Sequence, residues 1–233
     1  KLCRAIIENG LNKIKFFTQA SVKGFHDSPG LARLMKEAGF EWIFLGIESP
    51  DDESLKFFKK DNQLKSSDIE GVVNSLRREN IFVIGGIIIG NPNDSIASIY
   101  KTYDYLKKIK VDMITVMALT PYPGTELRNE LLKKNYIINK DDLSRYDNYH
   151  VNVRTDYLSS GELFNILDTI THKYFVGSGA IIRIIKRYPL FFVKSFFKFI
   201  FYHPDMVFHH LTKGIFLSRK RYVSSRSELA GNI

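Results

Sequence analysis

Four apolar segments alternate along this chain with segments whose apolar residues recur at helical spacing. The apolar segments are rich in β-branched and aromatic residues, which predicts strands near 14–20, 41–47, 81–89 and 112–119. Because helices separate consecutive strands, the strands should be parallel. The pattern therefore predicts an α/β fold in which the carboxyl ends of all four strands meet at one edge of the sheet, where such folds bind ligands.

The helical segments carry boundary signals of their own. An opening helix should end before Gly10, and a second should have its cap at Ser28 and its end at Gly39. Ser159 and Glu162 have the spacing of a capping box, which predicts the start of a late helix. The other expected helices start at Ser49, Ser66, Ile96 and Glu126.

The predicted strands run into polar or glycine-rich tips. Glu48 and Ser49 follow the second strand, and a carboxylate there can accept hydrogen bonds from two ribose hydroxyls, although both residues also suit the start of a helix. The glycines of 85–90 lie within the third strand, where they either expose backbone to a flat ring or permit close packing. These glycines do not open a helix, so a Rossmann pyrophosphate site is not expected.

With these tips, the chain resembles the radical S-adenosylmethionine superfamily, in particular the members that carry a cobalamin-binding domain upstream. The resemblance covers roughly residues 1–175. It rests on four motifs, one at each tip: residues 16–21 (FFTQAS), 45–49 (LGIES), 86–94 (GIIIGNPND) and 121–127 (PYPGTEL). Each motif is weak by itself, but four in the family's order on consecutive strands are specific.

The resemblance implies a partial (β/α)6 barrel of the TIM type, of which this chain supplies strands three to six, followed by a helical tail. In the family, the fourth strand's tip binds the ribose of S-adenosylmethionine and the fifth strand binds its adenine. No catalytic residue or metal ligand is assigned. The expected cofactor-binding residues are Gln19, Ser21, Glu48, Ser49, Gly85, Gly86, Ile88, Gly90, Asp94 and Pro121.

The cysteine content departs from the family pattern. Members hold a [4Fe-4S] cluster with three cysteines spaced CxxxCxxC, whereas Cys3 is the only cysteine here, and one thiolate cannot replace three. Because the chain opens at Lys1 within a helical pattern, we expect a fragment that lacks the cluster-binding segment; a cluster-free relative is the alternative. A single cysteine also excludes an internal disulfide, which is typical of the reducing cytoplasm.

The resemblance implies an enzyme that cleaves S-adenosylmethionine reductively at its cluster to drive radical chemistry, with methyl transfer through cobalamin from an upstream domain as one outcome. It also implies a small-molecule substrate and an electron donor such as ferredoxin or flavodoxin. Two alternatives stay open. One is a degenerate barrel that binds a nucleoside or a membrane. The other is an ordinary TIM-barrel lyase or hydrolase with Glu48 and Asp94 as acid and base, which is disfavoured because no Lys, His or Cys stands at a strand tip.

The tail differs from the rest of the chain in charge. Of the net charge of +9, residues 180–233 contribute ten Lys and Arg against two acidic residues, a net +8. The aromatic run 190–202 is too short to cross a bilayer as a helix, which predicts either an interfacial helix on an anionic membrane or a helix packed on the barrel. The clustered phenylalanines lack an RNA-binding signature, so no nucleic-acid partner is expected.

These patterns divide the chain into three regions. We expect the partial barrel at 1–134, a connecting segment and closing helix at 135–179, and a basic, aromatic helical tail at 180–233. The expected location is cytoplasmic, with contact through the tail to the inner face of the membrane.

Overall fold

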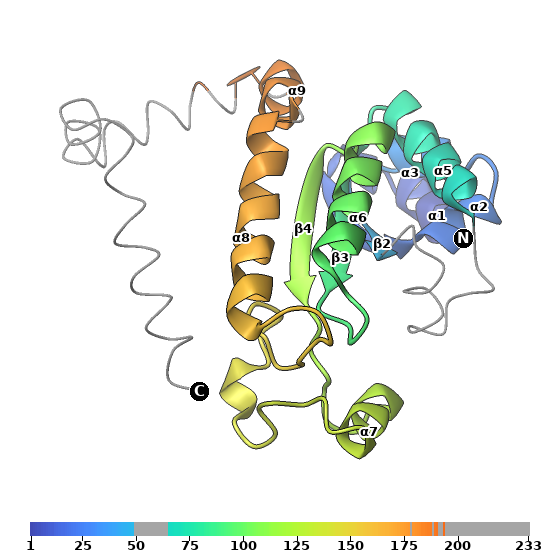
Figure 1. Ribbon diagram of the computed structural model, residues 1–233. Coiled ribbons are helices and arrows are strands. Elements are labelled where there is room, and N and C mark those ends of the chain that lie inside the picture. Colours follow the sequence, from blue (N-terminus) through green and yellow to red (C-terminus); the bar gives the residue numbers. More distant parts are fainter. Residues whose placement is uncertain (49–64, 178, 188, 191–192, 194–233) are drawn as a thin grey trace. The chain divides into compact units, whose positions relative to one another are not determined.

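The computed structural model of the protein describes residues 1–48, 65–177, 179–187, 189–190 and 193. Within them lies a parallel sheet of four strands in the order β1-β2-β3-β4, as Figure 1 shows. The strands are β1 Phe16–Ser21, β2 Phe40–Glu48, β3 Phe82–Ile89 and β4 Met113–Ala118. The predicted α/β fold and the order of its strands are therefore confirmed.

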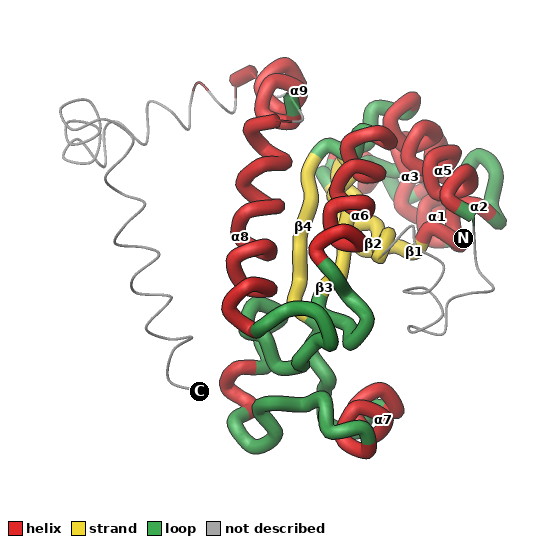
Figure 2. The backbone as a smooth tube through the Cα atoms, in the orientation of Figure 1, coloured by secondary structure: helices red, strands yellow, loops and turns green. Residues whose placement is uncertain are grey.

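The helices occupy the crossovers between the strands and continue after β4 (Figures 1 and 2). Helix α5 precedes β3, helix α6 precedes β4, and α8 runs alongside β4. The bounds are α1 Leu2–Glu8, η1 Leu11–Lys13, α2 Val22–His26, α3 Leu31–Glu37, α5 Ser66–Arg78, α6 Ile96–Ile109, α7 Glu126–Lys133, η2 Leu143–Arg145, α8 Ser160–Gly177 and α9 Ala180–Arg187.

One face of the sheet packs against helices that include α3, α5 and α8, and forms the core. Ile43 and Leu45 of β2 are fully buried, in the same cluster as Val73 and Leu76 of α5. Alternate residues of the other strands join that cluster, because side chains of a strand alternate between its two faces. The remaining residues of each strand point to the opposite face.

A local cap and one long-range hydrogen bond fix α8. The predicted capping box is confirmed, since the Ser159 backbone N–H donates to Glu162 Oε2 (2.9 Å) and the Glu162 N–H donates back to Ser159 Oγ (3.3 Å). The backbone N–H and hydroxyl of Ser159 hold the pKa of the Glu162 carboxyl below its usual range. Farther along, the buried Tyr174 hydroxyl donates to the Val111 carbonyl (2.5 Å), just before β4.

The region after β1 differs from the prediction. The helix expected from Ser28 begins at Leu31, because Gly30 adopts a left-handed conformation (φ +84°) immediately before it. A five-residue helix, α2, precedes it, and Ser21 caps that helix by accepting from the Gly24 N–H (3.2 Å). Five residues are too few to show a helical period in sequence. The helix expected from Ser49 lies outside the described residues.

The chain divides into two units, Lys1–Ala180 and Ile181–Ile233. Most of the aromatic run 190–202 lies outside the described residues. None of the helices that the structure describes is long and apolar enough to cross a bilayer.

Candidate functional site

Strand register aligns two glycines between two hydroxyl residues near the carboxyl edge of the sheet. Ser21 pairs with Gly46, Gly46 with Gly86, and Gly86 with Thr115, so one row crosses all four strands. We call these four residues the glycine row. Because the two middle residues have no side chain, no Cβ projects from the middle of the row on the face opposite the helices.

Below the glycine row, the same face is apolar and aromatic. The next row is Gln19, Phe44, Ile84 and Met113, and the row after it contains Phe17, Trp42 and Phe82. The Trp42 and Phe82 rings stack with their centroids 4.2 Å apart. Phe44 and Met113 are half-buried, whereas Gln19 is exposed at the β1 edge. This face therefore combines an aromatic floor with a row of backbone and hydroxyl groups near the strand tips.

The two glycines of β3 meet different surroundings. A Cβ at Gly86 would lie 2.3 Å from Phe44 Cζ, so the Phe44 ring fills the space that the missing side chain leaves. A Cβ at Gly85 would face the helix-covered side and lie 3.0 Å from Ile47 Cδ1. Both glycines thus have a packing role, and their predicted contact with adenine stays a prediction.

A buried carboxylate organises the tip of β3. Asp94 Oδ2 accepts from the backbone N–H groups of Gly90 (2.6 Å) and Asn91 (3.1 Å), and Oδ1 accepts from the Asn91 side-chain amide (2.8 Å). Ser95, not Asp94, caps α6. Because Asp94 is only 6% exposed and accepts three hydrogen bonds within its own loop, its geometry is that of a loop anchor and gives no support to a role as a general acid or base.

The other predicted binding residues lie along the same edge. Ile88 is half-buried at the end of β3, and Pro121 is buried three residues after β4. The Glu48 backbone ends β2, where the pairing with β3 shifts register between Gly46 and Glu48. The Glu48 side chain and Ser49 lie outside the described residues, so their predicted contacts with ribose stay predictions.

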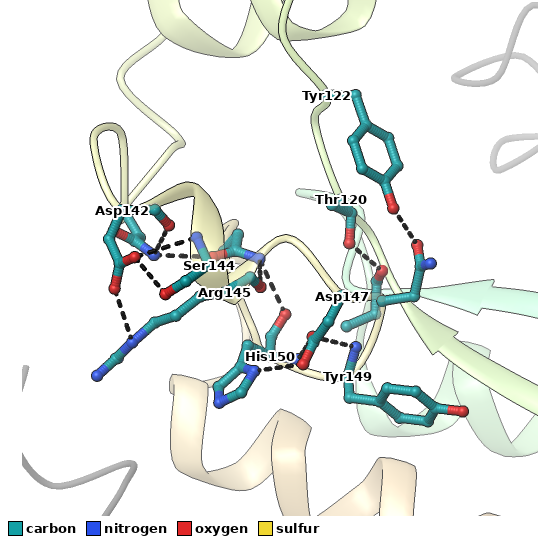
Figure 3. A network of polar contacts seen from close by, with 12 residues as sticks. Thr120, Tyr122, Asp142, Ser144, Arg145, Asp147, Tyr149 and His150 are labelled. Carbon is teal, nitrogen blue, oxygen red and sulfur yellow. Dashed lines mark hydrogen bonds and ion pairs between the residues drawn. The ribbon is translucent and has the colours of Figure 1, made fainter.

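A polar loop that the sequence did not single out packs against the end of β4. Figure 3 shows Tyr122 and Thr120 facing this loop, which includes Asp147 and His150. The Ala118 N–H donates to the Asn148 carbonyl (2.6 Å), and the Tyr122 hydroxyl donates to Asn148 Oδ1 (3.3 Å). Asn148 has φ +67°, which asparagine tolerates better than most residues. These bonds fix the loop at the carboxyl edge of the sheet.

Within that loop, Asp147 is an acceptor for three donors. The Tyr149 and His150 backbone N–H groups donate to Oδ1 (both 2.9 Å), and His150 Nδ1 lies 2.8 Å from Oδ2. Burial opposes the charge on the Asp147 carboxyl, but these three donors outweigh it and hold its pKa below the usual range. Asp-Asn at 147–148 is a turn signal, which is the one sequence feature that could have indicated this loop.

Arg128 of α7 ties the segment after β4 to the same loop. Its Nη1 donates to the Pro121 carbonyl (3.0 Å) and the Tyr146 hydroxyl (2.7 Å), and Nη2 donates to the Lys140 carbonyl (2.8 Å). Its guanidinium also lies over the Tyr146 ring, 5.3 Å from the centroid. No sequence signal identifies this contact, because it joins residues of three segments.

The described residues offer no metal centre. No three side chains of His, Cys, Asp or Glu within them gather into a group that could hold an ion. Cys3 is buried on α1, and a single thiolate would not hold an iron–sulfur cluster. The residues present therefore do not fit a cluster, whereas the glycine row offers backbone and hydroxyl groups to an organic ligand.

No protein-family model matches the chain. Among curated proteins, it is 28% identical over 183 residues to bacteriochlorophyllide d C-12(1)-methyltransferase of Chlorobaculum tepidum, which covers 78% of this chain and 39% of that protein. It is 30% identical over 114 residues to hopanoid C-2 methylase of Rhodopseudomonas palustris, which covers 49% of this chain and 21% of that protein. The chain thus spans less than half the length of these relatives.

Two solved structures share the fold. Coproporphyrinogen III oxidase (HemN) from Escherichia coli, a radical SAM enzyme, matches 76% of this chain and 37% of its own with a TM-score of 0.56 at 13% identity. The radical S-adenosylmethionine methyltransferase TsrM from Kitasatospora setae, solved with cobalamin and a [4Fe-4S] cluster, matches 60% of this chain and 28% of its own with a TM-score of 0.52 at 18% identity. In sequence the chain is thus similar to methylating enzymes, and it shares its fold with two radical S-adenosylmethionine enzymes.

Proposed function

We propose that this chain supplies the S-adenosylmethionine-binding and substrate-facing part of a radical S-adenosylmethionine methyltransferase. The observation that carries the proposal is the glycine row, Ser21–Gly46–Gly86–Thr115, which crosses the parallel sheet from the last residue of β1 to the middle of β4. Because Gly86 has no Cβ, the Phe44 ring lies close to β3, and a flat ring would stack on it with Ile88 as a further apolar contact. Glu48 lies two residues after Gly46, where the pairing of β2 with β3 shifts register, and its carboxylate would accept hydrogen bonds from the ribose hydroxyls.

The choice of methyl transfer rests on the sequence relatives. Two of them are named as methylating enzymes, one for a bacteriochlorophyllide and one for a hopanoid. The floor formed by Phe17, Trp42, Phe44 and Phe82 supports an acceptor with a large apolar surface, because such a molecule would cover the exposed Phe17 ring and the half-buried Trp42 and Phe44 rings.

The cofactors belong to the same proposal. A [4Fe-4S] cluster supplies the electron that cleaves S-adenosylmethionine, and its thiolate ligands have to come from outside these 233 residues, since Cys3 is the only cysteine. Cobalamin and an electron donor such as ferredoxin or flavodoxin complete the proposed system; TsrM was solved with cobalamin bound. This chain's own part is to bind the nucleoside, orient the acceptor and exclude water from both.

Binding of S-adenosylmethionine tests the proposal directly. The whole protein with its cluster-binding cysteines, prepared anaerobically, should bind S-adenosylmethionine, and Gly86→Val should weaken that binding at least about tenfold by displacing the Phe44 ring from its place beside β3. Glu48→Ala should lose roughly 1–3 kcal/mol of binding free energy through the ribose contacts. Gly71→Ala on the exposed side of α5, where a Cβ meets nothing within 4 Å, is the control and should leave the affinity unchanged.

Two results would contradict the proposal. One is affinity that neither Gly86→Val nor Glu48→Ala alters, which would leave both residues structural. The other is nucleoside binding without any cleavage of S-adenosylmethionine in the reduced whole protein, which would favour a binding module.

A further inference from the structure

The helix α9 presents isoleucine side chains to solvent. Ile181, Ile182 and Ile185 are 42%, 60% and 42% exposed, although isoleucine is among the residues most often buried in proteins. Leu190 and Val193, the next aliphatic residues described after the helix, are exposed as well. Apolar side chains gathered on one element in this way mark an interaction surface.

The isoleucines lie together on one side of the helix. At about 100° per residue, Ile181, Ile185 and Ile182 fall within an arc of about 100°, and the cationic residues Arg183 and Lys186 fall beyond its edge. The helix contains no acidic residue. Its surface is therefore an apolar stripe bordered by positive charge.

The charge around the helix restricts what can cover it. The region 180–233 has a net charge of +8, so a second copy of the chain would bring like charge to the same surface. Nucleic acid would neutralise the cations but leave the isoleucines in water. An anionic bilayer offers phosphate groups to the cations and the acyl-chain boundary to the isoleucines.

We propose that α9 binds the surface of an anionic phospholipid bilayer, with Ile181, Ile182 and Ile185 inserted at the boundary between headgroups and acyl chains. Lys186 contacts the lipid phosphates, and the net charge of +8 of the region 180–233 attracts the chain to the anionic surface. The helix lies in the plane of the interface and does not cross it, since eight residues extend only about 12 Å. This inference uses no residue of the glycine row and stands independently of the proposed function.

Cosedimentation with lipid vesicles tests the inference on the complete 233-residue chain. Wild-type protein should bind vesicles that contain phosphatidylglycerol, bind those of phosphatidylcholine alone much more weakly, and lose affinity as salt is added. The triple change Ile181→Ser, Ile182→Ser and Ile185→Ser should weaken binding at least about tenfold. Lys186→Gln alone should weaken it about fivefold at low salt.

Matched controls distinguish binding through α9 from nonspecific adsorption of the protein to vesicles. Ile96→Ser removes an isoleucine that is 51% exposed on α6, and Lys134→Gln removes an exposed cation after α7; both should bind vesicles like the wild type. Circular dichroism checks that each variant is folded. If the triple isoleucine variant is unfolded, the effect of Lys186→Gln and the salt dependence of wild-type binding test the inference in its place.

Any of four results would overturn the inference. Three of them are equal binding to both kinds of vesicle, binding that neither change in α9 affects, and wild-type protein that binds no vesicle but forms a dimer that the isoleucine changes dissociate. Binding of the wild type to single-stranded RNA in preference to vesicles would overturn it too.

Discussion

The ring of Phe44 on β2 fills the space beside Gly86 on β3, so that a Cβ at Gly86 would lie 2.3 Å from the Phe44 Cζ atom. Glycine at this position is thus coupled to an aromatic residue on the neighbouring strand. Because Phe44 is half-buried and its ring end is the nearest atom, the ring is the group that must move when a side chain is added at Gly86.

The first prediction follows from that contact. Gly86→Ala should destabilise the protein by about 1–3 kcal/mol, since the added methyl displaces the Phe44 ring. In a Phe44→Leu background the same change should cost clearly less, so the two changes should not be additive. Unfolding in urea measures all four free energies of the cycle.

Gly71→Ala provides the comparison for this cycle. A Cβ at Gly71 meets no atom within 4 Å, so alanine in the interior of α5 should stabilise the protein by about 0.5–1 kcal/mol. An equal cost of Gly86→Ala in both Phe44 backgrounds would show that the ring does not set the requirement for glycine.

The predictability of these features depends on how local they are in sequence. Strands and most helices followed from apolar periodicity, and the Ser159–Glu162 capping box followed from four consecutive residues. The contact between Phe44 and Gly86 required the register of β2 against β3, which no local pattern specifies. The strand-tip motifs could be read from the sequence, but the packing role of their glycines could not.

The start of α3 and the role of Asp94 show a second limit. Ser28 and Gly30 lie two residues apart, both precede an apolar period, and only the left-handed φ of Gly30 decides where the helix begins. Asp94 and Ser95 are adjacent short polar residues with different roles: Ser95 caps α6, whereas the Asp94 carboxylate accepts from the Gly90 N–H. Short polar side chains serve several local hydrogen-bonding patterns, so composition alone does not choose among them.

The second prediction concerns the buried carboxylate at the tip of β3. Asp94→Ala should cost about 2–3 kcal/mol, because the Gly90 and Asn91 N–H groups lose their acceptor in a buried loop. Hydrogen exchange at these two amides should accelerate more than the global loss of stability explains. Asp104→Ala, at an exposed position of α6, should change neither quantity, and comparable effects of the two substitutions would contradict the anchoring role.

The third prediction tests the contact between α7 and the polar loop. Arg128→Lys should destabilise the protein by about 1–3 kcal/mol, since an ammonium group cannot reproduce the planar fork that reaches the Pro121 and Lys140 carbonyls. Limited proteolysis should then cut within residues 139–150 faster than in the wild type. Arg33→Lys, which alters one exposed ion pair with Glu37, should change stability by at most about 0.5 kcal/mol. Unchanged protection of the loop in Arg128→Lys would contradict the prediction.

The last prediction is a dependence of stability on pH, and it arises where β2 begins. Glu41 pairs with Lys15 before β1 and with Lys36 of α3 (3.5 Å). The hydrogen bond from Lys15, against a smaller opposing effect of burial, lowers the pKa of the Glu41 carboxyl from its ordinary value of 4.5. The ion pairs therefore connect the first two strands and the helix between them only while this carboxylate is charged.

The sign of the effect follows from that lowered pKa. A carboxyl that ionises more easily in the folded state than in the unfolded state adds stability at pH values above 4.5, and this contribution disappears as the pH falls through the lowered folded-state pKa. Glu41→Gln should thus cost about 0.5–1 kcal/mol near neutral pH, and the difference from wild type should shrink as the solution is made strongly acidic. Urea unfolding of both proteins across this range measures it. Glu8 on α1 is an exposed carboxyl without an ion pair among the described residues, so Glu8→Gln should give a plot of unfolding free energy against pH that is parallel to that of the wild type. A difference between Glu41→Gln and wild type that is constant with pH would show that the charge of Glu41 does not contribute to stability.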